Sequence, residues 1–194
     1  MDMGLATLLT SFTLIFLAEL GDKTQICTII LSSKASASSV FFGAMLAFLL
    51  VDGLSALLGG ELLALLPRNI LSLATGFIFI IFGLISLLRK SEGATCEKTE
   101  ATLMQTFLLV SLMELGDKTQ FSSILLAAKF ENPLFVLVGI MLAFTAVTAI
   151  GVFLGYKILR FIPEKYLRIG ASTLFVTLGL IFLLEALLNV RIMP

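Results

Sequence analysis

The sequence predicts an all-α membrane protein of six transmembrane helices, arranged as two inverted-topology repeats of three helices each. Three observations predict this fold: an apolar composition, six long apolar segments and a heptapeptide that occurs twice. Hydrophobic residues make up 59% of the 194 residues, charged residues make up 13%, and the mean hydropathy is +1.11. Because soluble domains carry about 25% charged residues, this chain has too few polar side chains to cover a water-exposed globule.

Six apolar segments have the length of a membrane crossing, which needs about 20 mostly apolar residues. Short runs rich in Ser, Pro or Asn separate them, as expected for turns between helices. The polar stretch near residue 95 divides the chain into a first repeat at 1–90, a cytoplasmic linker at 91–101 and a second repeat at 102–194. We expect the two repeats to form one integrated domain. The predicted spans are 5–31, 40–66, 69–88, 102–128, 134–158 and 167–189.

The heptapeptide Glu-Leu-Gly-Asp-Lys-Thr-Gln occurs at residues 19–25 and again at 114–120, ninety-five positions later. We call these copies the first and second motif. The similarity extends further along each half, since residues 43–48 resemble residues 139–144. Three spans in each half is an odd number, so the second half must enter the membrane in the opposite orientation. Inverted repeats of this kind place a substrate near the bilayer midplane, where the halves meet.

The distribution of Lys and Arg predicts the orientation of the helices, because cytoplasmic loops carry an excess of basic residues. The loops after the first, third and fifth spans are the basic ones. We therefore expect these loops in the cytoplasm and both termini outside. The basic side holds Lys34, Arg89, Lys90, Lys98, Lys157, Arg160, Lys165 and Arg168, and the opposite side holds Arg68, Lys129 and Arg191.

Each motif places two acids near the centre of a predicted span. In a continuous helix, Glu19 and Asp22 would lie on one face at a spacing of three residues, as would Glu114 and Asp117. Charged side chains at this depth are costly and are typical of functional sites. Carboxylate oxygens are the ligands that magnesium, calcium and manganese prefer. We therefore predict that these four acids bind a metal ion.

The other motif residues are predicted to support this site. The glycines permit close helix approach, local unwinding or exposure of a backbone carbonyl. The threonine hydroxyls and glutamine amides add further oxygen atoms. The supporting residues are Gly21, Lys23, Thr24 and Gln25 in the first motif and Gly116, Lys118, Thr119 and Gln120 in the second.

The charges of the two motifs suggest an exchange mechanism. Four acids and two lysines leave two negative charges, which one divalent cation or two protons would neutralise. Competition between these ions for one site is the physical basis of an antiporter. The alternative is that the acids and lysines pair only with one another, for example Glu19 with Lys23 at a spacing of four residues, and hold helices together.

Three further acids lie in or near the predicted spans. Asp52 is near the middle of the second span, and its counterpart in the second repeat is Thr148. We interpret Asp52 as a proton relay or an extra ligand, with a structural carboxylate hydrogen-bonded between helices as the alternative. Glu61 and Glu185 lie toward span ends, and we expect both side chains to extend to the membrane interface.

The composition excludes several other functions. The chain has no histidine, which excludes a histidine-based metal site. Its net charge of zero argues against a nucleic-acid partner. No set of nucleophile and base is visible, so we predict neither an enzyme nor a resident cofactor. Cys27 and Cys96 show no metal-ligand spacing, and no disulfide framework is expected. The expected partners are the lipid bilayer and the transported ions, and assembly into a homo-oligomer stays open.

Two Glu-x-Gly-Asp-Lys-Thr motifs, three spans apart in a chain of this length, resemble the Gdt-type cation exchanger family. The resemblance covers essentially the whole chain, and neither motif departs from the family pattern. It implies export of manganese, or else calcium, from the cytoplasm in exchange for protons or sodium. It also implies that Glu19, Asp22, Glu114 and Asp117 bind the cation, and that the chain is a multi-pass protein of the bacterial inner (plasma) membrane.

Two other functions stay open at this point. A passive cation channel also selects its ions with acidic side chains, although a lysine adjoins each acid pair in this chain. An exporter of a small organic cation, such as an amino acid, would need a carboxylate for the ammonium group and a cation for the carboxylate. The motifs supply both kinds of group.

Overall fold

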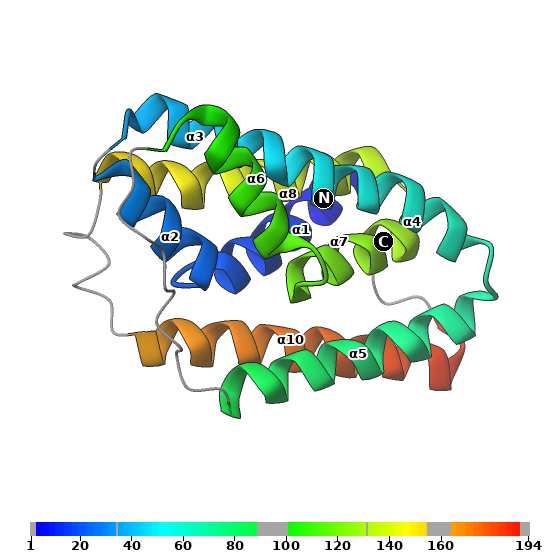
Figure 1. The fold of residues 1–194 in the computed structure, drawn as a ribbon. Helices are drawn as coiled ribbons and strands as arrows, with labels where there is room; N and C mark the ends of the chain where they lie inside the picture. Colours follow the sequence, from blue (N-terminus) through cyan, green and yellow to red (C-terminus); the bar gives the residue numbers. More distant parts are fainter. Residues whose placement is uncertain (1–2, 34, 89–100, 131, 155–163, 191–194) are drawn as a thin grey trace.

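The computed structural model of the chain describes residues 3–33, 35–88, 101–130, 132–154 and 164–190 (Figure 1). Every regular element among these residues is a helix, so the all-α prediction is confirmed. The first half contains α1 (Met3–Glu19), α2 (Lys23–Ser32), α3 (Ala37–Phe48), the π-helix η1 (Leu49–Gly53), α4 (Leu54–Ala64) and α5 (Arg68–Leu88). The second half contains α6 (Leu103–Glu114), α7 (Lys118–Lys129), α8 (Pro133–Ala149), the π-helix η2 (Ile150–Leu154) and α10 (Glu164–Leu188).

Four helical stretches are long and apolar enough to cross a membrane, namely Ala37–Ala64, Arg68–Leu88, Pro133–Phe153 and Ile169–Leu188. A bend of 69° separates Gly4–Glu19 from Lys23–Ser32, and this pair makes a fifth crossing if it is one broken span. By length and composition, the described residues therefore provide four or five spans. The predicted spans at 5–31 and 102–128 are not continuous helices, because each is divided into two helices.

In each motif, the glycine causes the break between the two helices. Gly21 has a φ of 83° and Gly116 a φ of 78°, in the left-handed region that side chains with a Cβ rarely adopt. Each glycine N–H is bonded within its own motif: Gly21 donates to Gln25 Oε1 at 2.6 Å, and Gly116 donates to Gln120 Oε1 at 2.7 Å. The motif thus encodes a helix break and the group that satisfies its exposed N–H.

The break moves the motif acids out of a common helix. Glu19 is the last residue of α1, whereas Asp22 is the N-cap of α2, with an extended backbone at φ −78° and ψ 169°. Asp117 caps α7 in the same way, at φ −82° and ψ 165°. The expectation that each acid pair shares one face of a continuous helix is therefore wrong. A carboxylate at a helix N-terminus is favoured by the helix dipole, which suits both aspartates.

The helices of the two halves pack in crossed pairs. α1 packs against α8, and α3 packs against α6. A Cβ at Gly43 would lie 2.6 Å from the carbonyl oxygen of Leu103, and a Cβ at Gly139 would lie 2.6 Å from that of Leu8. These two contacts occupy equivalent positions of the two halves. Close backbone approach at small residues is typical of helix packing in membranes.

α5 and α10 form a pair of their own. They lie side by side along one side of the molecule, and the other helices lie on the other side (Figure 1). Glycines again allow the contact: a Cβ at Gly83 would lie 3.0 Å from Ser172 O, and a Cβ at Gly179 would lie 2.8 Å from Gly76 O. This pair therefore packs as one unit against the helices that carry the motifs.

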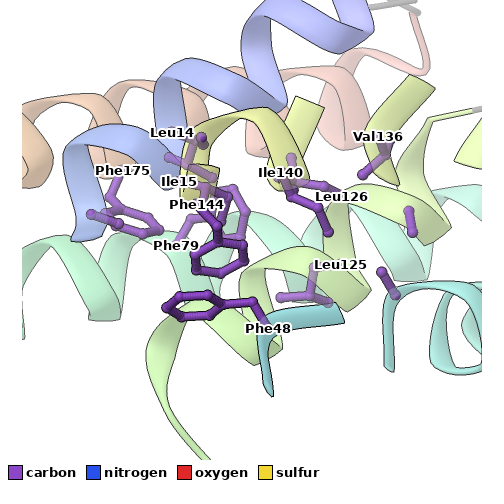
Figure 2. Close-up of a cluster of buried hydrophobic side chains, with 14 of the residues drawn as sticks. Leu14, Ile15, Phe48, Phe79, Leu125, Leu126, Val136, Ile140, Phe144 and Phe175 are labelled. Carbon is purple, nitrogen blue, oxygen red and sulfur yellow. The ribbon is translucent and has the colours of Figure 1, made fainter. Parts of the chain in front are cut away.

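Buried aromatic rings fill the space between the halves (Figure 2). Phe48 and Phe144 stack with their ring centroids 3.9 Å apart. Phe79 and Phe175 meet edge to face at 5.5 Å, which joins α5 to α10. Buried aliphatic side chains of the same cluster are also labelled, namely Leu14, Ile15, Leu125, Leu126, Val136 and Ile140. Dispersion between such closely packed groups is a main source of helix association in lipid.

Some predicted features lie outside the described residues. The linker at 91–101 does so apart from Ala101, and so do most of the basic residues on which the predicted orientation rests. The domain boundaries and the orientation therefore stay predictions.

Cys27 is part of a disulfide whose other sulfur lies outside the described residues. The expectation that no disulfide forms is wrong for this residue.

Candidate cation site

The two helix breaks lie against each other and exchange ion pairs. Lys23 Nζ lies 2.9 Å from Asp117 Oδ1, and Lys118 Nζ lies 2.8 Å from Asp22 Oδ2. Each lysine therefore neutralises the aspartate of the other motif. The pairing of Glu19 with Lys23 within one helix, considered from the sequence, is replaced by contacts between the halves.

Three of the four predicted ligands converge beside these ion pairs. Glu19, Asp22 and Asp117 each offer a carboxylate oxygen, and these oxygens all lie within 4.8 Å of one another. Glu19 is 1% exposed, and its Oε1 atom has no hydrogen-bond partner. Oxygens bound to one calcium ion at about 2.4 Å lie at most about 5 Å apart. The three carboxylates therefore have the spacing that one divalent cation needs.

Glu114 is fully buried beside this cluster but is held differently. Its Oε1 accepts a hydrogen bond from Thr24 Oγ1 at 2.5 Å, and its Oε2 accepts one from Thr119 Oγ1 at 3.2 Å. Both motif threonines thus donate to Glu114, whereas neither donates to Glu19. Charge still couples the two glutamates, because Glu114 and Glu19 interact electrostatically. The site is therefore less symmetric than the two identical motifs.

The motif glutamines tie each break to a helix of the other half. Gln25 Nε2 donates to the carbonyl oxygen of Val147 at 3.1 Å, and Gln120 Nε2 donates to Ser55 Oγ at 2.8 Å. Their Oε1 atoms, predicted to add oxygen atoms to the site, accept the glycine N–H groups. Ser55 and Val147 are hydrogen-bond partners of the motifs that sequence reasoning missed, and no motif marks them.

Asp52 lies on η1, which packs against α6 and α7. It is fully buried, and neither of its carboxylate oxygens accepts a hydrogen bond from another residue. It interacts electrostatically with Glu114 and Asp117. The structure thus places Asp52 on the second-motif side of the site, and no lysine among the described residues pairs with it.

A second charged cluster lies at the far end of α7. Lys129 forms an ion pair with Glu185 of α10, and its Nζ donates to Ser72 Oγ of α5 at 2.6 Å. Glu185 is 3% exposed, so the expectation that it extends to the membrane interface is wrong. Glu61 is exposed and lines a cavity of about 340 Å³ beside this cluster, and its place at the membrane interface stays a prediction. Nothing in the sequence pairs Lys129 with a residue 56 positions later.

Buried acids at the contact between two broken helices, inside a shell of apolar helices, are typical of membrane transporters. The chain matches the family described as "Divalent cation/proton antiporter GDT1" over residues 7–94 and 102–190. It belongs to this family. The resemblance that the two motifs predicted is therefore confirmed.

Relatives of the chain occur in plants and bacteria. The chain is 31% identical over 210 residues to "Protein PAM71, chloroplastic" of Arabidopsis thaliana, which covers 91% of this chain and 56% of that protein. It is 25% identical over 209 residues to "GDT1-like protein 1, chloroplastic" of Oryza sativa subsp. japonica, which covers 91% and 61%. The chain thus spans about three fifths of the length of these two relatives.

A bacterial relative matches over most of its length. The chain is 28% identical over 179 residues to the "Putative manganese exporter" of Vibrio cholerae, which covers 91% of this chain and 90% of that protein. No solved structure matches the chain.

Proposed function

We propose that the chain exports a divalent cation, manganese first and calcium second, across the plasma membrane in exchange for protons. The observation that carries this proposal is the convergence of Glu19, Asp22 and Asp117 within 4.8 Å at the contact between the two motifs. Membership in an antiporter family favours exchange over a passive channel or an amino-acid exporter. The manganese assignment draws on the name of the Vibrio cholerae relative.

The oxygen-only ligand set supports a hard cation. Carboxylates suit manganese and calcium, and thiolate or imidazole groups would be needed for softer metals. The crossed ion pairs supply the electrostatic balance, since Asp22 and Asp117 each already face a lysine. Glu19 keeps a buried oxygen with no hydrogen-bond partner. Among the three converging acids, Glu19 is therefore the residue whose negative charge most needs a bound cation.

The proposal includes the full predicted architecture. α1 with α2, and α6 with α7, each count as one broken span, which gives six crossings in two inverted repeats. In this mechanism the acids take the cation from the cytoplasm, and one repeat then moves relative to the other and opens the site outward. Protons from outside displace the cation and reset the carrier. Crossed contacts such as Lys23 with Asp117 would change during this movement.

Metal binding by the purified protein tests the site. Isothermal titration with MnCl₂ compares the wild type with Glu19→Gln, and with Glu61→Gln as a control that removes an exposed acid of α4. We expect Glu19→Gln to weaken binding at least about tenfold, because a charged ligand is lost. Glu61→Gln is expected to bind like the wild type. Equal affinity of Glu19→Gln and the wild type would overturn the site.

A further inference from the structure

Asp52 is a buried acid with no role in the site of three carboxylates. Its side chain is 0% exposed, and neither carboxylate oxygen accepts a hydrogen bond from another residue. An ionised carboxylate in such surroundings is strongly unfavourable unless a positive charge accompanies it. The backbone around Asp52 is a π-helix, a rare form that is frequent at functional sites. These observations indicate that the carboxylate of Asp52 binds a positively charged ion.

Charge counting shows what is needed. The crossed pairs match Asp22 with Lys118 and Asp117 with Lys23. Three acids then remain without a lysine: Glu19, Glu114 and Asp52. A divalent cation supplies two of the three positive charges that these acids require. One monovalent cation has to supply the third.

The charged groups near Asp52 do not supply this charge. The elements packed against η1 are α3, α4, α6, α7 and α8. Lys118 pairs with Asp22, and Lys129 pairs with Glu185 at the other end of α7. The described charged residues of these five elements, with the N-cap of α7, are Glu61, Glu114, Asp117, Lys118 and Lys129.

We propose that Asp52 and Glu114 form a second cation position, for a monovalent ion, beside the divalent position at Glu19, Asp22 and Asp117. Glu114 lies outside the cluster of three converging oxygens, and it interacts electrostatically with Asp52. The hydroxyls of Thr24 and Thr119 donate to Glu114, which stabilises its charged form and keeps two further oxygen atoms nearby. This inference rests on the proposed function, because the divalent position accounts for the other two charges.

The second position is present in one half only. Thr148 is the counterpart of Asp52 and is 3% exposed. A neutral hydroxyl at that point adds no charge beside the first motif. The two motifs are identical, so Asp52 is the residue that makes the charge of the site unequal between the halves. The monovalent ion is either sodium or a proton, and both would neutralise the same carboxylate.

Bound sodium is measured first. Purified protein in nanodiscs is saturated with MnCl₂ and equilibrated with radioactive sodium at fixed pH. If sodium is the ion, the wild type retains about one ion per chain, the charge left uncompensated by Mn²⁺, and Asp52→Asn retains none. The control Glu61→Gln is expected to match the wild type.

A proton is detected by infrared spectroscopy in sodium-free buffer. If a proton is the ion, the Mn²⁺-saturated wild type shows the carbonyl stretch of a protonated carboxylic acid. That band is expected to disappear in Asp52→Asn and to persist in Glu61→Gln. Should Asp52→Asn fail to fold, Asp52→Thr gives the side chain found at the equivalent position of the second half.

The outcomes test the monovalent position separately from the divalent position. Retained sodium or the Asp52-dependent band supports the monovalent position, and the absence of both overturns it. The Mn²⁺ dissociation constant is expected to change less than about threefold in Asp52→Asn, since a neutral amide replaces a neutral ion–carboxylate pair. A tenfold or larger change would assign Asp52 to the divalent ion and overturn the proposal. The monovalent position is also tested without Mn²⁺, where the wild type is still expected to bind one more monovalent ion than Asp52→Asn. A failure of the divalent site is therefore detected separately from a failure of the monovalent position.

Discussion

Lys23 of the first motif forms an ion pair with Asp117 of the second motif, with 2.9 Å between Nζ and Oδ1. Lys118 and Asp22 repeat this relationship in the opposite direction at 2.8 Å. The pairs join the two halves of the chain at the point where each half breaks its helix. The motif glutamates, Glu19 and Glu114, have no lysine partner in these pairs. The aspartate charges therefore hold the two halves together, and the glutamate charges stay available to a cation.

Loss of one crossed pair is expected to destabilise the fold. Lys118→Gln leaves Asp22 without its partner, and we expect the free energy of unfolding to fall by about 1–3 kcal/mol. The double variant Lys118→Asp with Asp22→Lys restores an ion pair in reversed orientation and is expected to recover part of that loss. Thermal unfolding in detergent measures both. Wild-type stability of Lys118→Gln would show that the pair contributes nothing to the fold.

The backbone of the second break predicts a cost for a side chain at Gly116. A Cβ there would contact nothing within 4 Å, so the cost of Gly116→Ala comes only from the φ of 78°. We expect a loss of about 1–2 kcal/mol, the penalty of a left-handed residue. Gly170→Ala is the matched control, because a Cβ at this position in α10 also contacts nothing within 4 Å. It is expected to be neutral or stabilising, and equal losses in both variants would contradict the account.

Close approach of the crossed helices predicts equal effects at two distant glycines. Alanine at Gly43 or Gly139 would put a Cβ 2.6 Å from a backbone oxygen, so the helices must separate. We expect each variant to lose about 1–3 kcal/mol of stability. Measured unfolding of the two single variants should agree closely. A large loss in one and none in the other would show that the two contacts are not equivalent.

The buried pair of Lys129 and Glu185 predicts a non-additive response. Lys129→Met removes the ammonium group that pairs with the buried carboxylate of Glu185, and we expect a loss of about 3–5 kcal/mol. Adding Glu185→Leu removes that buried negative charge as well, so the double variant is expected to be more stable than Lys129→Met alone. Comparing the unfolding of the single and double variants tests this. Equal stability of the two would mean that the charge of Glu185 is compensated by another group.

The sequence predicted the helical class, the motif residues and the family, because apolar composition and an exact repeat are visible without a structure. The break within each motif was harder to predict. Gly21 is compatible with close packing, unwinding or carbonyl exposure, and only the φ of 83° and the bond to Gln25 select unwinding. Helix periodicity then placed Glu19 and Asp22 on one face, which the break prevents.

Contacts between distant residues account for the remaining differences. The pairing of Lys23 with Asp117, and of Lys129 with Glu185, depends on how helices pack, which local patterns do not encode. Symmetry also misled at one point: identical motifs suggested equivalent glutamates, but both threonines donate to Glu114. The surroundings of the two motifs differ because of residues outside the motifs, such as Asp52, whose counterpart in the second half is Thr148.

Coupled transport is the most direct test of the central claim. Proteoliposomes with an acidic interior are placed in MnCl₂, and Mn²⁺ uptake is recorded together with the internal pH. We predict uptake of Mn²⁺ with loss of protons in the wild type and in Glu61→Gln, and neither movement in Glu19→Gln or Asp117→Asn. Mn²⁺ uptake at the wild-type rate in both motif variants, or uptake without proton loss, would contradict cation/proton exchange at these carboxylates.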